Sequence, residues 1–262
     1  MSFQGTSFIF NGVPSEQYGL IVTKLGTEEE TFSAGANVNP ITDKTLRSAE
    51  FELLGVEQSE PLSFPIEFSS QKPLDAFNRS AINLWLFGQK KYCDLQICQR
   101  DLRNFYYHCF LTDPEFVYYD NYAYSIRATV VCDAPWAWEY PRTKRWSFPD
   151  TQFNKIRFLN LSNDSNDTLP QVSFTLTRNN TKFTVINHSY NDRRFEWTGL
   201  QGGETISVDC KTGIIISSTG LRRADNFNKK FLRLINGNND LECIGTVSDF
   251  AITYRPVRKV GG

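Results

Sequence analysis

Histidine and cysteine are the residues whose chemistry would be easiest to recognise, and this chain has few of them in useful arrangements. Its two histidines, His108 and His188, give acid–base catalysis or a metal site little to work with. Four residues separate Cys93 from Cys98, and no second Cys or Cys/His pair stands at zinc spacing. The sequence therefore predicts no catalytic residue, no metal site and no cofactor, and we expect a protein that is not an enzyme.

One polar segment could bind a sugar. Residues 188–193, followed by Trp197, loosely resemble the polar patch and stacking tryptophan with which galectins hold a galactoside. The spacing differs by one inserted residue, and strand alternation makes Trp197 equally suitable as a core residue. A packed tryptophan beside a polar turn is the competing interpretation. The candidates for sugar binding are His188, Asn191, Arg193 and Trp197.

The charges of the chain are unevenly distributed, although its net charge is only −1. Residues 1–75 contain 11 Asp/Glu and 4 Lys/Arg, whereas residues 76–262 contain 18 and 24, which gives −7 and +6. The acidic residues of the first part gather at residues 28–30 and 50–60. Solvated loops are the simplest explanation of such a cluster.

The bulk composition predicts a folded protein of two domains. Of the 262 residues, 40% are hydrophobic and 14% aromatic, which is enough to build sizeable cores. The start of the chain has no basic run followed by an apolar stretch, and no segment approaches the roughly 18 apolar residues of a membrane span. We expect a soluble protein, made in a cytoplasm, with six free thiols.

The N-terminal part predicts a β-domain with one helix. A strand leads into Asn11-Gly12, a strong hairpin signal, and a second strand follows at residues 19–25. Residues 26–48 are polar and weakly periodic, which predicts a long excursion from the core. Residues 73–87 predict a helix, with Leu74, Phe77, Ala81, Leu84 and Trp85 on the face that covers a sheet.

The C-terminal part predicts a β-sandwich. Residues 134–150 carry prolines and basic residues without periodicity, as inter-domain connections do. Beyond them, short strands alternate with Gly, Asn and Asp turns, and no helical pattern appears. We therefore expect an N-terminal domain at residues 1–140, a linker at 141–152 and a second domain at 153–262.

Three stretches of the N-terminal part, in order, resemble the distal tail proteins of siphophages. Residues 8–22 are similar to that family's opening strand and turn with a following Tyr-Gly-Leu strand. Residues 82–88 resemble its helix ending in a Trp-Leu pair, and residues 124–137 resemble the strand that closes its first domain. The order and spacing of the motifs carry this resemblance.

The C-terminal part adds three similar stretches, at residues 195–200, 203–209 and 234–241, which resemble the family's galectin-like domain. The resemblance thus covers nearly the whole chain. It implies a mainly β fold, in which an N-terminal β-domain with one helix is followed by a galectin-like β-sandwich.

The resemblance also implies partners. In this family the N-terminal domains form a hexameric ring between the major tail tube protein and a tail-associated lysin or fibre hub protein. The C-terminal domains carry receptor-binding or side-fibre proteins. Such a protein is assembled in the bacterial cytoplasm and ends in the tail tip of the virion, away from any membrane. A carbohydrate-binding module for host attachment is the alternative, although the chain has no room for the large sugar-binding insertions of some relatives.

A ring around passing DNA gives the acidic segment a function. We expect residues 26–48 to reach a neighbouring subunit or the ring stacked above. Because each Lys or Arg contact with a phosphate adds affinity for DNA, a channel wall should be acidic, and DNA would be cargo only. The candidates for this ring or lumen loop are Glu28, Glu29, Glu30, Glu50, Glu52 and Glu57.

Overall fold

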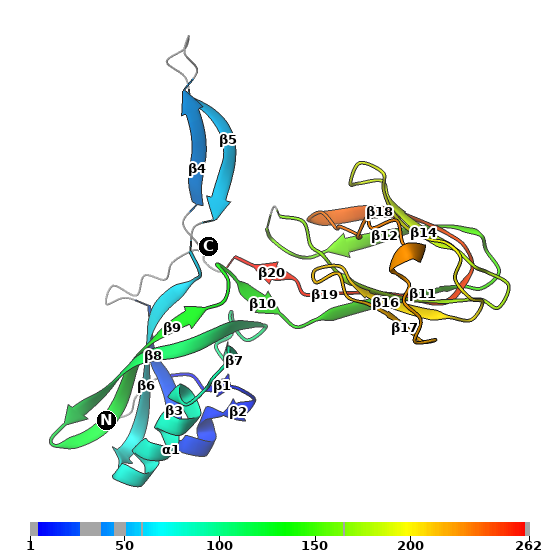
Figure 1. Ribbon diagram of the computed structural model, residues 1–262. Helices are drawn as coiled ribbons and strands as arrows, with labels where there is room; N and C mark the ends of the chain where they lie inside the picture. The colour runs from blue at the N-terminus through cyan, green and yellow to red at the C-terminus, as the bar shows by residue number, and fades with distance from the viewer. Residues whose placement is uncertain (1–4, 27–37, 45–50, 59, 165, 260–262) are drawn as a thin grey trace. The chain divides into compact units, whose positions relative to one another are not determined.

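The computed structural model describes residues 5–26, 38–44, 51–58, 60–164 and 166–259 (Figure 1). The chain divides into two compact units, of which the first comprises Met1–Glu139 with Arg258–Gly262 and the second Tyr140–Val257. The chain thus leaves the first unit, forms the second and returns. The described residues are mainly β, with one α-helix, which confirms the fold class expected from the sequence.

The first unit contains most of the long strands and the helix (Figure 1). Its strands are β1 (Phe8–Phe10), β2 (Val13–Pro14), β3 (Leu20–Leu25), β4 (Val38–Lys44), β5 (Phe51–Gln58), β6 (Ser63–Leu74), β7 (Cys93–Ile97), β8 (Phe105–Tyr119), β9 (Tyr122–Cys132) and β10 (Ala137–Glu139). A short 3-10 helix, η1 (Ser15–Tyr18), precedes β3, and the returning strand β20 (Val257–Arg258) pairs with β10.

The main sheet of the first unit follows the order β2-β1-β7-β8-β9-β6-β3, and its neighbouring strands run antiparallel. Thr6, just before β1, exchanges two backbone hydrogen bonds of 3.1 and 2.8 Å with Val22 on β3. This bridge links the segment before β1 to β3, the strand at the far end of the order. Gly5 is required beside it, because a Cβ there would lie 2.5 Å from the carbonyl oxygen of Val22.

The turn predicted at Asn11-Gly12 joins β1 to β2 as a two-residue hairpin. Both residues have positive φ angles, of 51° and 78°, as a type I′ turn requires. Asp120 and Asn121, with φ angles of 48° and 68°, make the same kind of turn between β8 and β9. In both places the sequence positions the strands through residues that tolerate the left-handed region.

Helix α1 (Ala76–Phe87) covers a face of the main sheet through Ile82, Trp85 and Leu86. The carboxylate of Asp75 caps it by accepting the N–H of Asn78 at 2.7 Å. Of the face expected from the sequence, Leu74 and Trp85 are buried as predicted, but Phe77 and Leu84 are 82% and 74% exposed, so that part of the prediction was wrong. Their exposure follows from how Trp85 anchors the helix, as described below.

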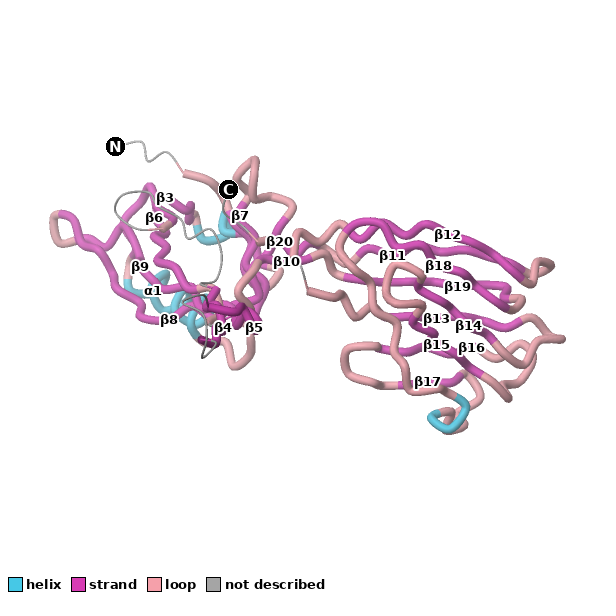
Figure 2. The backbone as a smooth tube through the Cα atoms, turned by 90° about the horizontal axis from the view of Figure 1, so that it is seen from above, coloured by secondary structure: helices cyan, strands magenta, loops and turns pink. Residues whose placement is uncertain are grey.

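The second unit is a sandwich of two antiparallel sheets (Figure 2). One sheet follows the order β11-β19-β13-β16-β17, and the other β12-β18-β14-β15. The strands are β11 (Arg142–Phe148), β12 (Phe153–Asn160), β13 (Gln171–Leu176), β14 (Phe183–Asn187), β15 (Arg193–Trp197), β16 (Thr205–Asp209), β17 (Ile215–Ser217), β18 (Gly237–Ile244) and β19 (Val247–Tyr254), with a 3-10 helix η2 (Ala224–Asn226).

Aromatic rings join the two layers of this sandwich. Phe183, on one sheet, lies with its ring centroid 4.8 Å from Phe174 and 5.3 Å from Phe250, both on the other sheet. All three are fully buried. Such pairs add stability beyond the area that they bury, so this contact defines the core of the second unit.

The segment expected to be a linker at residues 141–152 forms part of this sandwich instead. It contains β11, whose residues Arg142 to Phe148 pair with β19. Trp146 and Phe148 pack against the core, which explains why a segment rich in basic residues is a strand. Its charged residues Arg142, Lys144 and Arg145 are all exposed, although alternation places Arg142 and Lys144 on the same face of the strand as Trp146.

Candidate functional site

Strands β4 and β5, which we call the arm, pair with each other and with no other described strand. Ile41, Leu53 and Leu54 are 47%, 63% and 64% exposed on it. An isolated two-stranded sheet is marginally stable in water at best, and exposed large apolar side chains usually mark a contact surface. The arm therefore has the properties of an element completed by another protein.

The arm contains part of the predicted acidic loop. Glu52 and Glu57 lie on β5, opposite Asp43 and Asn39 in the register of the two strands. The remaining candidates, Glu28, Glu29, Glu30 and Glu50, lie outside the described residues. That these carboxylates face a lumen stays a prediction.

Trp85 fixes the orientation of helix α1. Its indole N–H donates to the carbonyl of Phe10 at 3.1 Å, and its ring stacks on Tyr18 and Phe8 with centroids 4.5 and 5.7 Å away. This contact turns Phe77 and Leu84 away from the sheet. Arg79 is the helix's one charged residue, and its guanidinium donates to the hydroxyl of Tyr118 at 2.6 Å. The outer side of α1 is therefore uncharged and partly apolar.

Trp197, the proposed stacking residue of a sugar site, is fully buried in the sandwich core. Its ring stacks on Phe227, with centroids 4.6 Å apart and planes 17° from parallel. A buried ring offers no face to a sugar, so the packed interpretation of this tryptophan is correct. Alternation along the strand is the sequence signal that indicates it.

Of the other three sugar candidates, which lie near one another in sequence, His188 and Arg193 are hydrogen-bonded within the protein. His188 Nδ1 lies 2.6 Å from Asp192 and its Nε2 lies 2.9 Å from Glu242. The hydrogen bonds to these carboxylates raise the pKa of His188 above its usual 6.5. Arg193 donates to the carbonyl of Phe231 at 2.7 Å, and Asn191 occupies a turn with φ 50°. Together they form a polar turn beside a charged sheet face.

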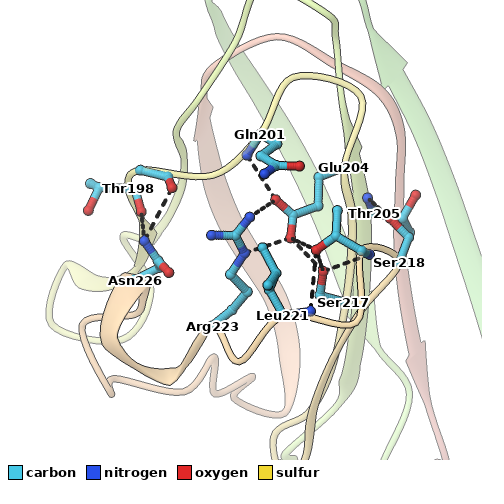
Figure 3. Close-up of polar contacts among 11 residues, drawn as sticks. Thr198, Gln201, Glu204, Thr205, Ser217, Ser218, Leu221, Arg223 and Asn226 are labelled. Atoms are coloured by element: carbon cyan, nitrogen blue, oxygen red, sulfur yellow. Dashed lines mark hydrogen bonds and ion pairs between the residues drawn. The ribbon is translucent and has the colours of Figure 1, made fainter.

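A buried ion pair in the second unit was not predicted from the sequence. Arg223 Nε and Nη2 each lie 2.8 Å from a different carboxylate oxygen of Glu204 (Figure 3). Glu204 Oε1 also accepts the hydroxyls of Ser217 at 2.5 Å and Thr219 at 3.3 Å, and Oε2 accepts the N–H of Gln201 at 2.8 Å. We call this set of contacts the Glu204 clamp.

The clamp compensates for the burial of its carboxylate. Burial alone would raise the pKa of Glu204, but the hydrogen bonds from Arg223, Ser217 and Gln201 together hold it below the usual 4.5. Ser217 ends strand β17, and Arg223 precedes helix η2, so the clamp holds the whole turn between them against β16. Gly203-Glu204, the start of the stretch at residues 203–209, was the available signal, although the partner Arg223 lies 19 residues from Glu204.

Three buried cysteines form a row across the main sheet of the first unit. Cys109 lies directly opposite Cys93 on one side and Cys132 on the other. Burial raises the pKa of all three thiols, that of Cys132 to about 12. They thus serve as core residues. All six cysteines are free, and Cys98 alone among them is exposed.

The described residues carry neither a metal-binding cluster nor a membrane-spanning helix. No group of three or more His, Cys, Asp or Glu side chains among them is arranged to hold a metal ion. No helix in that part of the chain is long and apolar enough to cross a membrane.

Comparison with known proteins identifies the family. A family described as the phage tail protein N-terminal domain matches residues 3–134, and one described as the phage tail C-terminal domain matches residues 136–254. The chain belongs to this phage tail protein family. The family boundary near residue 135 lies close to the point where the first unit of the structure gives way to the second. No curated protein sequence matches the chain.

A solved structure shares the fold of this phage tail protein along nearly its whole length. The chain is similar to the Dit protein of phage SPP1, with a TM-score of 0.70 and 9% sequence identity. The similarity covers 96% of this chain and 99% of the SPP1 protein, which is described as a paradigm of the hub adsorption apparatus in phages that infect Gram-positive bacteria. At this identity the comparison establishes the fold, and function needs further argument.

Proposed function

We propose that this phage tail protein is the distal tail hub of a long-tailed phage. The main support for this proposal is that both of its units, in order and over nearly their whole length, share the fold of the SPP1 Dit protein. In this proposal the first units form a hexameric ring that connects the tail tube to the tail-tip or fibre hub protein. The second unit, a galectin-like sandwich, docks receptor-binding or side-fibre proteins.

The arm supports the ring. A closed ring needs head-to-tail contacts between unlike surfaces of identical subunits, and an extended two-stranded element can reach across such a contact. The arm exposes Ile41, Leu53 and Leu54 and pairs with no other described strand. Ring formation would bury these side chains and stabilise the hairpin.

The acidic residues support a DNA channel. Residues 27–60 contain eight Asp/Glu and two Lys/Arg, a net charge of −6. A wall of that sign would repel phosphate and let DNA pass as cargo. Replacing Glu28, Glu29 and Glu30 with lysine should make the assembled protein bind duplex DNA, with an affinity that falls steeply as salt rises. If the triple variant binds no more DNA than the wild-type protein, these residues do not line the channel.

The burial of Trp197 argues against the alternative of a sugar-binding module, and protein docking is the function we assign to the second unit.

The position of the protein in the virion can be tested directly. Gold-labelled antibodies raised against this chain should mark the tip of the tail in electron micrographs of intact phage. Labelling along the length of the tail would contradict the proposal.

A further inference from the structure

Helix α1 has two apolar faces, and the structure of a single chain explains only one of them. Ile82, Trp85 and Leu86 are buried against the sheet, whereas Phe77 is 82% and Leu84 74% exposed. A surface helix normally carries polar and charged residues on its outer side. Phe77, Ser80 and Leu84 are exposed and recur at spacings of three and four residues, which places them on one outer stripe. A stripe of this kind fits a helix covered on both sides.

The arm has the matching property. Its described apolar side chains, Ile41, Leu53 and Leu54, are all exposed. The two strands of the arm pair with each other and with no other described strand. The first unit therefore presents two apolar surfaces that face water in the single chain. In a head-to-tail ring, each subunit can place one surface on the other surface of its neighbour, so that both are buried at every contact.

Charge favours this pairing. The two described strands of the arm contain Asp43, Glu52 and Glu57 against Lys44, a net charge of −2. Residues 71–91, which include α1, contain four Lys/Arg and one Asp, a net charge of +3. The exposed basic residues Lys72, Lys90 and Lys91 stand before and after the helix. Opposite charges around an apolar centre steer association and fix its orientation.

We infer that the outer face of α1, centred on Phe77 and Leu84, is the docking site for the arm of a second copy of this chain. The inference rests on the proposed ring and names its contact. The arm of each subunit lies on α1 of the next, with Leu53 and Leu54 against the helix stripe. Six such contacts close the ring.

The test uses two double variants of the full chain. The helix variant, Phe77→Ser with Leu84→Ser, keeps a normal arm, and the arm variant, Leu53→Ser with Leu54→Ser, keeps a normal helix. Because all four side chains are exposed, both variants should fold like the wild-type protein, as circular dichroism would show. Each should weaken association by at least roughly 100-fold, the loss expected when two large apolar contacts are removed.

Mixing the two variants gives the decisive observation. One intact arm and one intact helix face then remain per pair, so the mixture should form heterodimers that stop at two subunits, measured by native mass spectrometry. A matched control is Phe153→Ser, which removes a phenylalanine 64% exposed on the second unit and should leave assembly unchanged.

The outcomes separate this inference from the hub proposal. If the wild-type chain forms rings and the helix variant forms them equally well, the arm docks elsewhere and the hub proposal stands. If the two variants do not form heterodimers on mixing, the inference is also overturned. A wild-type chain that stays monomeric up to its solubility limit would contradict the docking contact, whereas failure to find the protein at the tail tip would contradict the hub.

Discussion

Arg223 holds Glu204 by two hydrogen bonds of 2.8 Å, one to each carboxylate oxygen, at a site where both side chains are almost wholly buried. Removing one member of a buried ion pair leaves the other charge without compensation. Arg223→Met should therefore lower the free energy of unfolding of the second unit by about 3–5 kcal/mol, measured by urea unfolding. Arg157→Met breaks the exposed pair with Asp240 and serves as the control. A loss for the control as large as that for Arg223→Met would contradict this account of the clamp.

His188 gives the second unit a pH-dependent contribution to stability. Its pKa is raised above 6.5 in the folded protein by the carboxylates of Asp192 and Glu242. A raised folded-state pKa means that the contribution is fully present below 6.5 and is lost as the pH rises through the higher folded value. The size is modest because the side chain is 41% exposed. His188→Gln should remove this decline, which unfolding curves collected between acidic and alkaline pH would reveal. Parallel curves for the two proteins would refute the assignment.

The orientation of α1 predicts a large loss of stability on substitution of one aromatic residue of the helix and a small one on substitution of another. Trp85→Ala removes a stacked, hydrogen-bonded core residue and should cost about 3–5 kcal/mol. Phe77→Ser removes an exposed ring and should change the stability of the monomer by less than about 0.5 kcal/mol. Thermal and urea unfolding of both variants would measure this contrast. Comparable losses would mean that Phe77 faces the core.

Substitution of Trp197 distinguishes a role in the core from a role in sugar binding. Because it stacks on Phe227 in the interior, Trp197→Ala should destabilise the second unit by about 3–5 kcal/mol. Wild-type protein on a glycan array should give no signal for this residue to affect. A specific glycan signal that Trp197→Ala abolishes without loss of stability would restore the carbohydrate-binding alternative.

Much of the fold could be predicted because local signals agreed with it. The turn at Asn11-Gly12, and strands such as β14, β16 and β19, carry alternation and turn chemistry that tertiary contacts did not override. The motifs that resemble distal tail proteins likewise indicate the phage tail family from the amino-acid sequence alone. Their order along the chain is the reliable feature.

Other elements were decided by contacts that no local pattern encodes. Residues 237–240 are turn-prone by type, Gly-Asn-Asn-Asp, yet they begin strand β18. The buried side chain of Asn239 accepts hydrogen bonds there from the side chain of Asn187 and from the backbone N–H of Ile235. Strand β11 was not predicted because its basic residues resemble those of a linker. Its neighbouring apolar residue Trp146 packs against the core. The outer face of α1 was assigned to the core because Phe77 and Leu84 are apolar, and rotation set by Trp85 decided otherwise.

The ring is the central claim, and the mass of the assembled particle tests it most directly. Mass photometry of the purified chain, alone and with the tail tube protein of the same phage, would weigh the assembly. Six copies of a 30.1 kDa chain should give a particle of about 181 kDa, six times that value, and negative-stain images should show six-fold symmetry. A protein that stays at 30.1 kDa under both conditions, or closes with a different number of subunits, would contradict the hexameric hub.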